Sequence, residues 1–126
     1  MKTVKINQGL SDFSEPEEGE IYQIVNVGES VAKGYKGISI EFTPKKQTEE
    51  NKKTQYRITA WLGQNDTVGT RSKLGSFISA FTDYYEAKEG DTQKGLEMAQ
   101  DTANWITHFV KIVEWKNKNR EIKVIS

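Results

Sequence analysis

The sequence of 126 residues contains no cysteine, one histidine and two prolines. Without cysteine, the chain has no disulfide framework, no thiolate metal site and no cysteine nucleophile. The N-terminal stretch MKTVKINQGLSDFSEPEEGE also lacks a continuous apolar run. We therefore expect neither a secretory signal nor a membrane anchor, and we expect an intracellular, cytoplasmic setting.

The chain has no excess of charge of either sign, because 18 basic residues balance 18 acidic ones. This balance excludes a strongly basic nucleic-acid binder that relies on its overall field. The charge is unevenly distributed, since residues 1–30 hold two lysines against six acidic residues. A basic groove on the remainder of the chain is therefore compatible with the neutral total.

Signatures of catalysis are also missing. His108 lies in an expected strand without the converging ligands of a metal site or the partner of a general base. The glycines between Gly69 and Gly75 are not followed by the Gly-Lys-Ser/Thr of a phosphate-binding loop. We expect a protein that is not an enzyme and that uses no catalytic residue, metal or other cofactor.

The strongest pattern that is present predicts a helix from Gly69 to Gly90. Its apolar residues recur at the spacing that places one helix face against a core: Leu74, Phe77, Ile78, Phe81 and Tyr85. Thr70 and Ser72 can cap its start, and Gly90 can end it. A weaker helical pattern follows from Asp91 to Asn104 and is expected to cross one end of a barrel.

Strand patterns lie on both sides of this helix. Three are predicted before it, at Glu20–Val31 with a bulge or bend at Gly28, at Gly37–Thr43 and at Thr54–Leu62, and two after it, at Trp105–Trp115 and Arg120–Ile125. The last two form a hairpin across Lys116–Asn119, and adjacent apolar pairs in Trp105–Trp115 indicate a bulge or two-sided burial. Residues 1–18 read as a polar, acidic lead-in with a short edge strand at Thr3–Ile6, and residues 19–126 as a single domain.

Two residues stand out on the polar row of Thr54–Leu62. Alternation places Tyr56, Ile58, Ala60 and Leu62 toward the core, which leaves Arg57 and Trp61 on the outer row. An exposed tryptophan beside an arginine needs a functional reason. Two alternatives stay open: Trp61 lies in the core, or it lies beneath the N-terminal arm. Trp105 and Trp115 are expected in the core or at the barrel rim.

Three strands, a helix and two strands form the element order of the five-stranded OB barrel, in which the helix lies between strands three and four. The fold class is therefore mainly β (β+α), with an OB-fold-like barrel. Over Glu18 to Ser126 the sequence resembles the small OB-fold single-stranded-DNA-binding proteins of phages and other mobile elements. The residues that carry this resemblance are a Glu-Gly-Glu-x-Tyr opening at Glu18–Tyr22, a Lys-Gly-x-Lys-Gly turn at Lys33–Gly37, the helix stretch Ser72–Phe81 and a closing Asn-x-Glu-Ile-Lys at Asn119–Lys123.

This resemblance implies non-enzymatic binding of single-stranded nucleic acid during replication or recombination. The resemblance favours DNA as the ligand, with RNA as the alternative. Bases would stack on exposed aromatics while lysines and arginines neutralise phosphates. The implied binding residues are Trp61 and Arg57 on the third strand, Lys33, Tyr35 and Lys36 at the first turn, Lys45, Lys46, Lys52 and Lys53 on the long loop, and Lys116, Lys118 and Arg120 at the last turn.

Zero net charge favours a second interpretation, in which the same barrel is a protein-interaction or assembly module. Trp61 would then be a hot spot for another chain, either a second copy in a homo-oligomer or a replication-protein partner. The acidic run at Glu15, Glu17 and Glu18 also has two interpretations. It is either a solvated arm or an arm that covers a basic surface of its own domain until a ligand displaces it.

Overall fold

Three long strands form the centre of the fold: β2 (Ile21–Ala32), β3 (Tyr35–Pro44) and β4 (Gln55–Trp61). They belong to a computed structural model that describes residues 13–32, 34–62, 72–116 and 120–126. Each strand carries alternating apolar residues, so one face is buried and the other is polar. These positions confirm the three strands predicted before the helix, with ends that differ by one or two residues.

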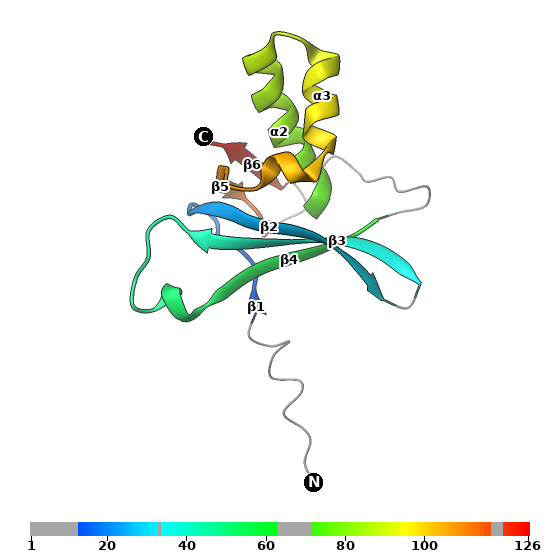
Figure 1. Ribbon diagram of the computed structural model, residues 1–126. Helices are drawn as coiled ribbons and strands as arrows, with labels where there is room; N and C mark the ends of the chain where they lie inside the picture. The colour runs from blue at the N-terminus through cyan, green and yellow to red at the C-terminus, as the bar shows by residue number, and fades with distance from the viewer. Residues whose placement is uncertain (1–12, 33, 63–71, 117–119) are drawn as a thin grey trace.

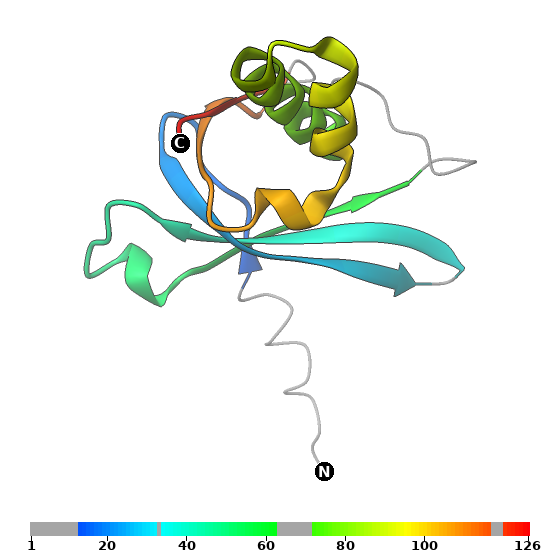
Figure 2. The same cartoon turned by 45° about the horizontal axis from the view of Figure 1, so that its top comes forward.

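The three strands belong to one six-stranded sheet with the order β1-β4-β3-β2-β5-β6. The remaining strands are β1 (Phe13–Ser14), β5 (Phe109–Glu114) and β6 (Glu121–Val124). β1 runs parallel to β4, and all other neighbours are antiparallel. The sheet curls into a half-barrel, and α2 and α3 lie together on one side of its long strands (Figures 1 and 2).

Two α-helices follow β4, α2 (Lys73–Glu89) and α3 (Thr92–Gln100), and the short helices η1 (Asn51–Lys53) and η3 (Thr102–Trp105) lie in the connections. The Ser72 hydroxyl caps α2 by accepting the Gly75 N–H at 3.0 Å. Gly90 ends the helix with φ of 72°, a left-handed conformation that glycine adopts without strain. Both ends of this helix are therefore set by the capping residues that the sequence indicates.

The aromatic residues of α2 join the helices to the sheet. Phe77 and Phe81 are fully buried, and the Phe81 ring stacks on Trp105 at 5.1 Å. The Trp105 indole N–H donates to the Ala99 carbonyl at 2.8 Å, so its polar edge is satisfied inside the core. Trp115 is also buried, at 5% exposure. The expected core positions of these two tryptophans are confirmed.

The structure corrects the predicted barrel in strand count and helix placement. The described residues form six strands instead of five, because Phe13–Ser14 pairs with the start of β4. The helices therefore follow the fourth strand of the sheet. The weaker helical pattern predicted from Asp91 to Asn104 is confirmed as α3 and η3. A strand of two residues carries no alternation, which is why sequence pattern could not show it.

The bulge predicted at Gly28 was wrong, because Gly28 pairs regularly with Ser39 and the register shifts between Ile24 and Asn26 instead. One extra residue at this point lets Ile24 and Val27, three positions apart, both face the core.

Three further predictions concern the ends of the chain. The bulge expected in the strand after the helix is confirmed between Ile112 and Glu114, but β5 begins only at Phe109 because Trp105 belongs to η3. The predicted strand Thr3–Ile6 and most of the turn Lys116–Asn119 lie outside the described residues. Within the described ranges, no helix has the length and apolarity needed to cross a membrane.

Candidate nucleic-acid interface

The polar side of β2, β3 and β4, here called the outer face, brings together the sequence's most unusual residues. On β4, Gln55, Arg57, Thr59 and Trp61 alternate with buried residues and so point away from the core. The cross-strand register places Gly37 opposite Trp61 and Ser39 opposite Thr59. Trp61 is 49% exposed, so its indole belongs to the surface and not to the core.

The Trp61 indole lies across the backbone of β3. A Cβ atom added at Gly37 would meet Cε3 of Trp61 at 2.6 Å and the Ala60 carbonyl oxygen at 2.8 Å. Only glycine leaves room for the ring at this position. One side of the indole therefore contacts the sheet, and about half of the residue's surface stays open to solvent.

Tyr35 extends the aromatic surface beyond Trp61. It is 66% exposed and precedes Gly37 by two residues, which places it on the same face as a diagonal neighbour of Trp61. Diagonal cross-strand neighbours lie about 7 to 8 Å apart, within reach of aromatic side chains. Lys36, also exposed, lies at the same end of β3.

Hydroxyl groups form the floor of the outer face next to the indole. The Ser39 hydroxyl lies 2.6 Å from that of Ser30 and 3.3 Å from that of Thr59. Ser39 is only 8% exposed, so these bonds satisfy a buried polar group. Because these side chains are small, they extend less far from the sheet than the Trp61 indole does. Sequence analysis missed this strip of hydroxyl groups, although the outward positions of Ser39 and Thr59 follow from the alternation that revealed Trp61.

Arg57 is the charged group of this strip. Its Nη2 donates to the Ser39 hydroxyl at 3.1 Å, and its guanidinium carbon lies 4.8 Å from the centre of the Phe13 ring. Its cross-strand neighbour Glu41 accepts a bond from Asn26 Nδ2 at 3.0 Å. Within the described ranges, the Arg57 guanidinium makes no direct ion pair, although Glu41 lies opposite it on β3.

The long-loop lysines lie elsewhere. They follow Pro44, and Trp61 lies opposite Gly37 near the other end of β3, so about 26 Å of strand separates Lys45 from Trp61. Lys45 places its ammonium over the Phe109 ring at 5.4 Å, Lys52 pairs with Glu49 at 2.9 Å, and Lys46 is exposed. Lys53 belongs to η1 at the same end.

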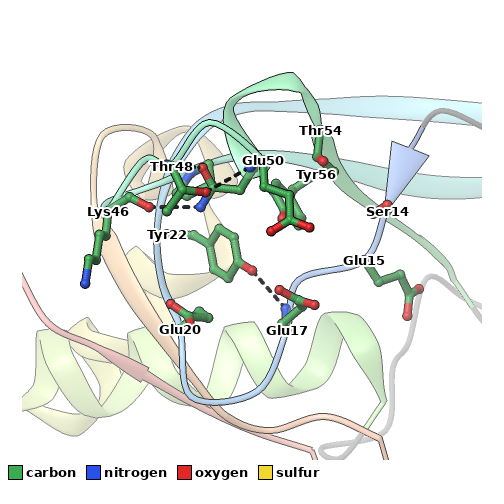
Figure 3. A pocket seen from close by; sticks show the side chains of 12 residues that line it. Ser14, Glu15, Glu17, Glu20, Tyr22, Lys46, Thr48, Glu50, Thr54 and Tyr56 are labelled. Atoms are coloured by element: carbon green, nitrogen blue, oxygen red, sulfur yellow. Dashed lines mark hydrogen bonds between the residues drawn. The ribbon is translucent and has the colours of Figure 1, made fainter.

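An acidic cavity lies at this loop end of the sheet. It has a volume of about 510 Å³ and is lined by Lys46 and by four glutamates, Glu15, Glu17, Glu20 and Glu50. Figure 3 shows the Tyr22 hydroxyl pointing into it, where it accepts the Glu17 N–H at 3.0 Å. Burial raises the pKa of Tyr22 to about 12, so the hydroxyl stays protonated. The negative wall makes this end unfavourable for a polyanion.

The last-turn residues form a third group. The Arg120 guanidinium lies over the Trp115 ring at 5.4 Å, and the backbone N–H of Lys116 donates to Glu18 at 3.0 Å. Lys33 and Lys118 lie outside the described residues. Of the twelve candidate residues, the structure therefore brings together Trp61, Tyr35 and Arg57 on one face. Lys36 lies at the same end of β3 but alternates onto the opposite face, and the other described candidates lie apart from these residues.

The single histidine has structural partners. His108 Nε2 lies 3.3 Å from the Tyr85 hydroxyl, and its Nδ1 lies 3.0 Å from the Ser126 carbonyl oxygen. The rings of Phe81 and Tyr84 contact its imidazole edge to face. These contacts hold the end of the chain against α2. Within the part of the chain that the structure describes, no group of three or more His, Asp or Glu residues could hold a metal ion.

We compared the chain with known proteins in three ways. Neither the protein-family models, the curated proteins nor the solved structures contain a match to the chain.

Proposed function

We propose that the protein binds single-stranded nucleic acid on the outer face of β3 and β4, with little sequence preference and without catalysis. DNA is the favoured ligand and RNA the alternative. The observation that carries this proposal is the half-exposed indole of Trp61, which lies on the same face as Arg57, an arginine that makes no direct ion pair among the described residues. Protection or presentation of single strands during replication or recombination is the role that fits such binding.

The chemistry of the outer face supports stacking as the main source of affinity. A base can lie against the open side of the Trp61 indole, and each such stack contributes about 1 to 3 kcal/mol. The low hydroxyl strip lets the sugar-phosphate backbone approach, and Ser30 and Thr59 can exchange hydrogen bonds with it. Arg57 supplies positive charge for phosphates on this face, and Lys36 supplies it at the edge of the hairpin end.

The strand pairing supports an OB-like arrangement. If β1 is set aside, β2 pairs with both β3 and β5, and the helices separate β4 from β5. In OB barrels the second and third strands form the face that binds oligonucleotides. These strands correspond here to β3 and β4, which carry Tyr35, Arg57 and Trp61.

Titration with a fluorescein-labelled oligodeoxythymidylate tests the proposal at low and at moderate salt. We expect binding at low salt that weakens only modestly at moderate salt, because few phosphates are neutralised and stacking is insensitive to salt. Duplex DNA of matched length is the control and should bind more weakly, since its bases are not available for stacking. Absence of oligonucleotide binding at both salt concentrations would end the proposal.

A second candidate function, protein interaction, is favoured by the apolar character of the hairpin end. Val31 is 72% exposed and pairs with Lys36, so it lies at the same end of the sheet as Tyr35 and Trp61 but on the opposite face. Exposed apolar groups of this kind mark interfaces with other chains. Light scattering after size exclusion separates the candidates: a DNA-independent oligomer that dissociates in Trp61→Ala would support assembly as the function of this surface.

A further inference from the structure

Phe13 and Arg57 form a contact between the N-terminal segment and the outer face. Phe13 belongs to β1, which pairs with β4 at only two positions, Gln55 and Tyr56. Its ring lies 4.8 Å from the guanidinium carbon of Arg57, within cation–π distance. A flat ring on a guanidinium plane is also the arrangement in which a nucleobase stacks on arginine.

The bonding of Arg57 is incomplete in this arrangement. Nη2 donates to Ser39, but Nε is buried and has no acceptor within the described part of the chain. A phenyl ring offers no oxygen that could accept from Nε. A nucleotide in place of Phe13 would offer both a flat ring for the guanidinium plane and phosphate or carbonyl oxygens for the donor.

We propose that Arg57 is a second base-stacking position and that Phe13 occupies it in the free protein as a substitute for a base. This inference rests on the proposed function and specifies how the same face is regulated. A bound strand stacks one base on Trp61 and another on Arg57, about 13 Å away along β4. To stack on Arg57, the strand displaces Phe13. The Phe13 side chain therefore competes with the ligand, and weakly bound ligands are excluded.

The contacts of the following residues make this displacement local. Pro16 is buried, and the Glu17 N–H donates to the Tyr22 hydroxyl at 3.0 Å. The Glu18 carboxylate accepts the backbone N–H groups of Trp115 and Lys116 at 2.7 and 3.0 Å. These bonds hold the segment from Pro16 onward, so only Phe13 and Ser14 need to leave β4. Two strand positions are a small barrier to such an opening.

The affinity of the Phe13→Ala variant for oligodeoxythymidylate, compared with that of the wild type, tests the inference. We expect this variant to bind roughly three- to ten-fold more tightly than the wild type, since binding no longer has to break the cation–π contact. Ser14→Ala, which alters the exposed neighbour in β1, should bind as the wild type does. In an Arg57→Ala background, the gain from Phe13→Ala should disappear. Unchanged or weaker binding by Phe13→Ala, with wild-type binding intact, would overturn the inference.

Hydrogen exchange of the wild-type protein gives an independent measurement that needs no variant. Saturation with oligodeoxythymidylate should speed amide exchange at residues 13–14 and slow it at Thr59 and Trp61. Slower exchange at residues 13–14 in the complex would contradict displacement. If neither the wild type nor Phe13→Ala binds the oligonucleotide, the proposed function itself fails, which is distinct from binding without displacement.

Discussion

Trp61 owes its exposed position to its neighbours. The alternation of β4 turns it away from the core, and the absence of a side chain at Gly37 lets its six-membered ring approach the adjacent strand closely. A ring supported in this way loses little conformational freedom when a base stacks on it, so more of the stacking energy is available for binding.

Replacement of Trp61 by alanine should weaken oligonucleotide binding by about 1 to 3 kcal/mol, the contribution of one base stack. Lys52→Ala is the matched control, because this exposed lysine lies at the opposite end of β3 and already pairs with Glu49. Its affinity should stay close to that of the wild type. Equal losses in the two variants, measured by fluorescence anisotropy, would mean that stacking on Trp61 is not the dominant interaction.

At the residue scale, the sequence could predict which side chains face outward but not how they combine. Alternation was sufficient to place Trp61 and Arg57 on one face. The contact between Phe13 and Arg57 joins residues 44 positions apart and depends on a two-residue strand. No periodic pattern in the sequence indicates such a contact. The distance between the loop lysines and Trp61 likewise depends on the direction and length of the strands.

At the scale of elements, the segment between β1 and β2 connects the two halves of the curled sheet. Glu15 pairs with Lys73 and accepts the Trp115 indole N–H at 3.0 Å, while Glu18 accepts two backbone N–H groups at the end of β5. The Gly19 N–H also donates to the Ile112 carbonyl at 2.6 Å. Among the described residues, neither β1 nor β4 pairs with β5. Side chains of the acidic run connect these two sides of the sheet instead.

These contacts lower the pKa values of both carboxyl groups. Burial alone would raise the pKa of Glu15, but hydrogen bonds from Lys73 and Trp115 and the charges of Lys73 and Arg120 outweigh it. Backbone N–H groups of Lys116 and Trp115 lower the pKa of Glu18. Because both values are lower in the folded state, the carboxylates stabilise the fold above their unfolded pKa, and this stability is lost as the pH falls through the folded values.

The expected result is a melting temperature that falls when the pH is lowered from about 7 to about 3, with a smaller fall in the Glu15→Gln, Glu18→Gln double variant. The double variant should also melt lower than the wild type at neutral pH, since it lacks both charges. Glu29→Gln, which changes an exposed glutamate of β2, is the control and should follow the wild type. Parallel melting curves for wild type and double variant across this pH range would refute the stabilising role of these carboxylates.

The long elements were predictable because their patterns are strong. The apolar stripe and caps of α2 and the alternation of β3 and β4 correspond to their observed positions within a few residues. β1 and the bulge in β2 were not predictable from local pattern. They depend on tertiary contacts, with β4 for β1 and with the core for the bulge that turns both Ile24 and Val27 inward.

At the scale of the whole molecule, the zero net charge separates into ends of different character. The loop end of β3 carries the acidic cavity around Tyr22, and the hairpin end carries Tyr35, Lys36 and Trp61. The glutamates of the cavity disfavour a polyanion at that site, which is consistent with the proposed interface at the aromatic end. Low net charge and an exposed indole together favour binding that depends more on stacking than on the release of counterions.

Tryptophan fluorescence tests the role of Trp61 most directly, because Trp105 and Trp115 are buried and Trp61 is 49% exposed. Addition of oligodeoxythymidylate to the wild-type protein at low salt should quench the emission of the exposed indole as a base stacks on it. In Trp61→Phe, which keeps a ring on Gly37, the quenching should be lost while the buried tryptophans still emit. Binding without quenching in the wild type, or equal quenching in Trp61→Phe, would contradict the assignment of the outer face as the nucleic-acid site.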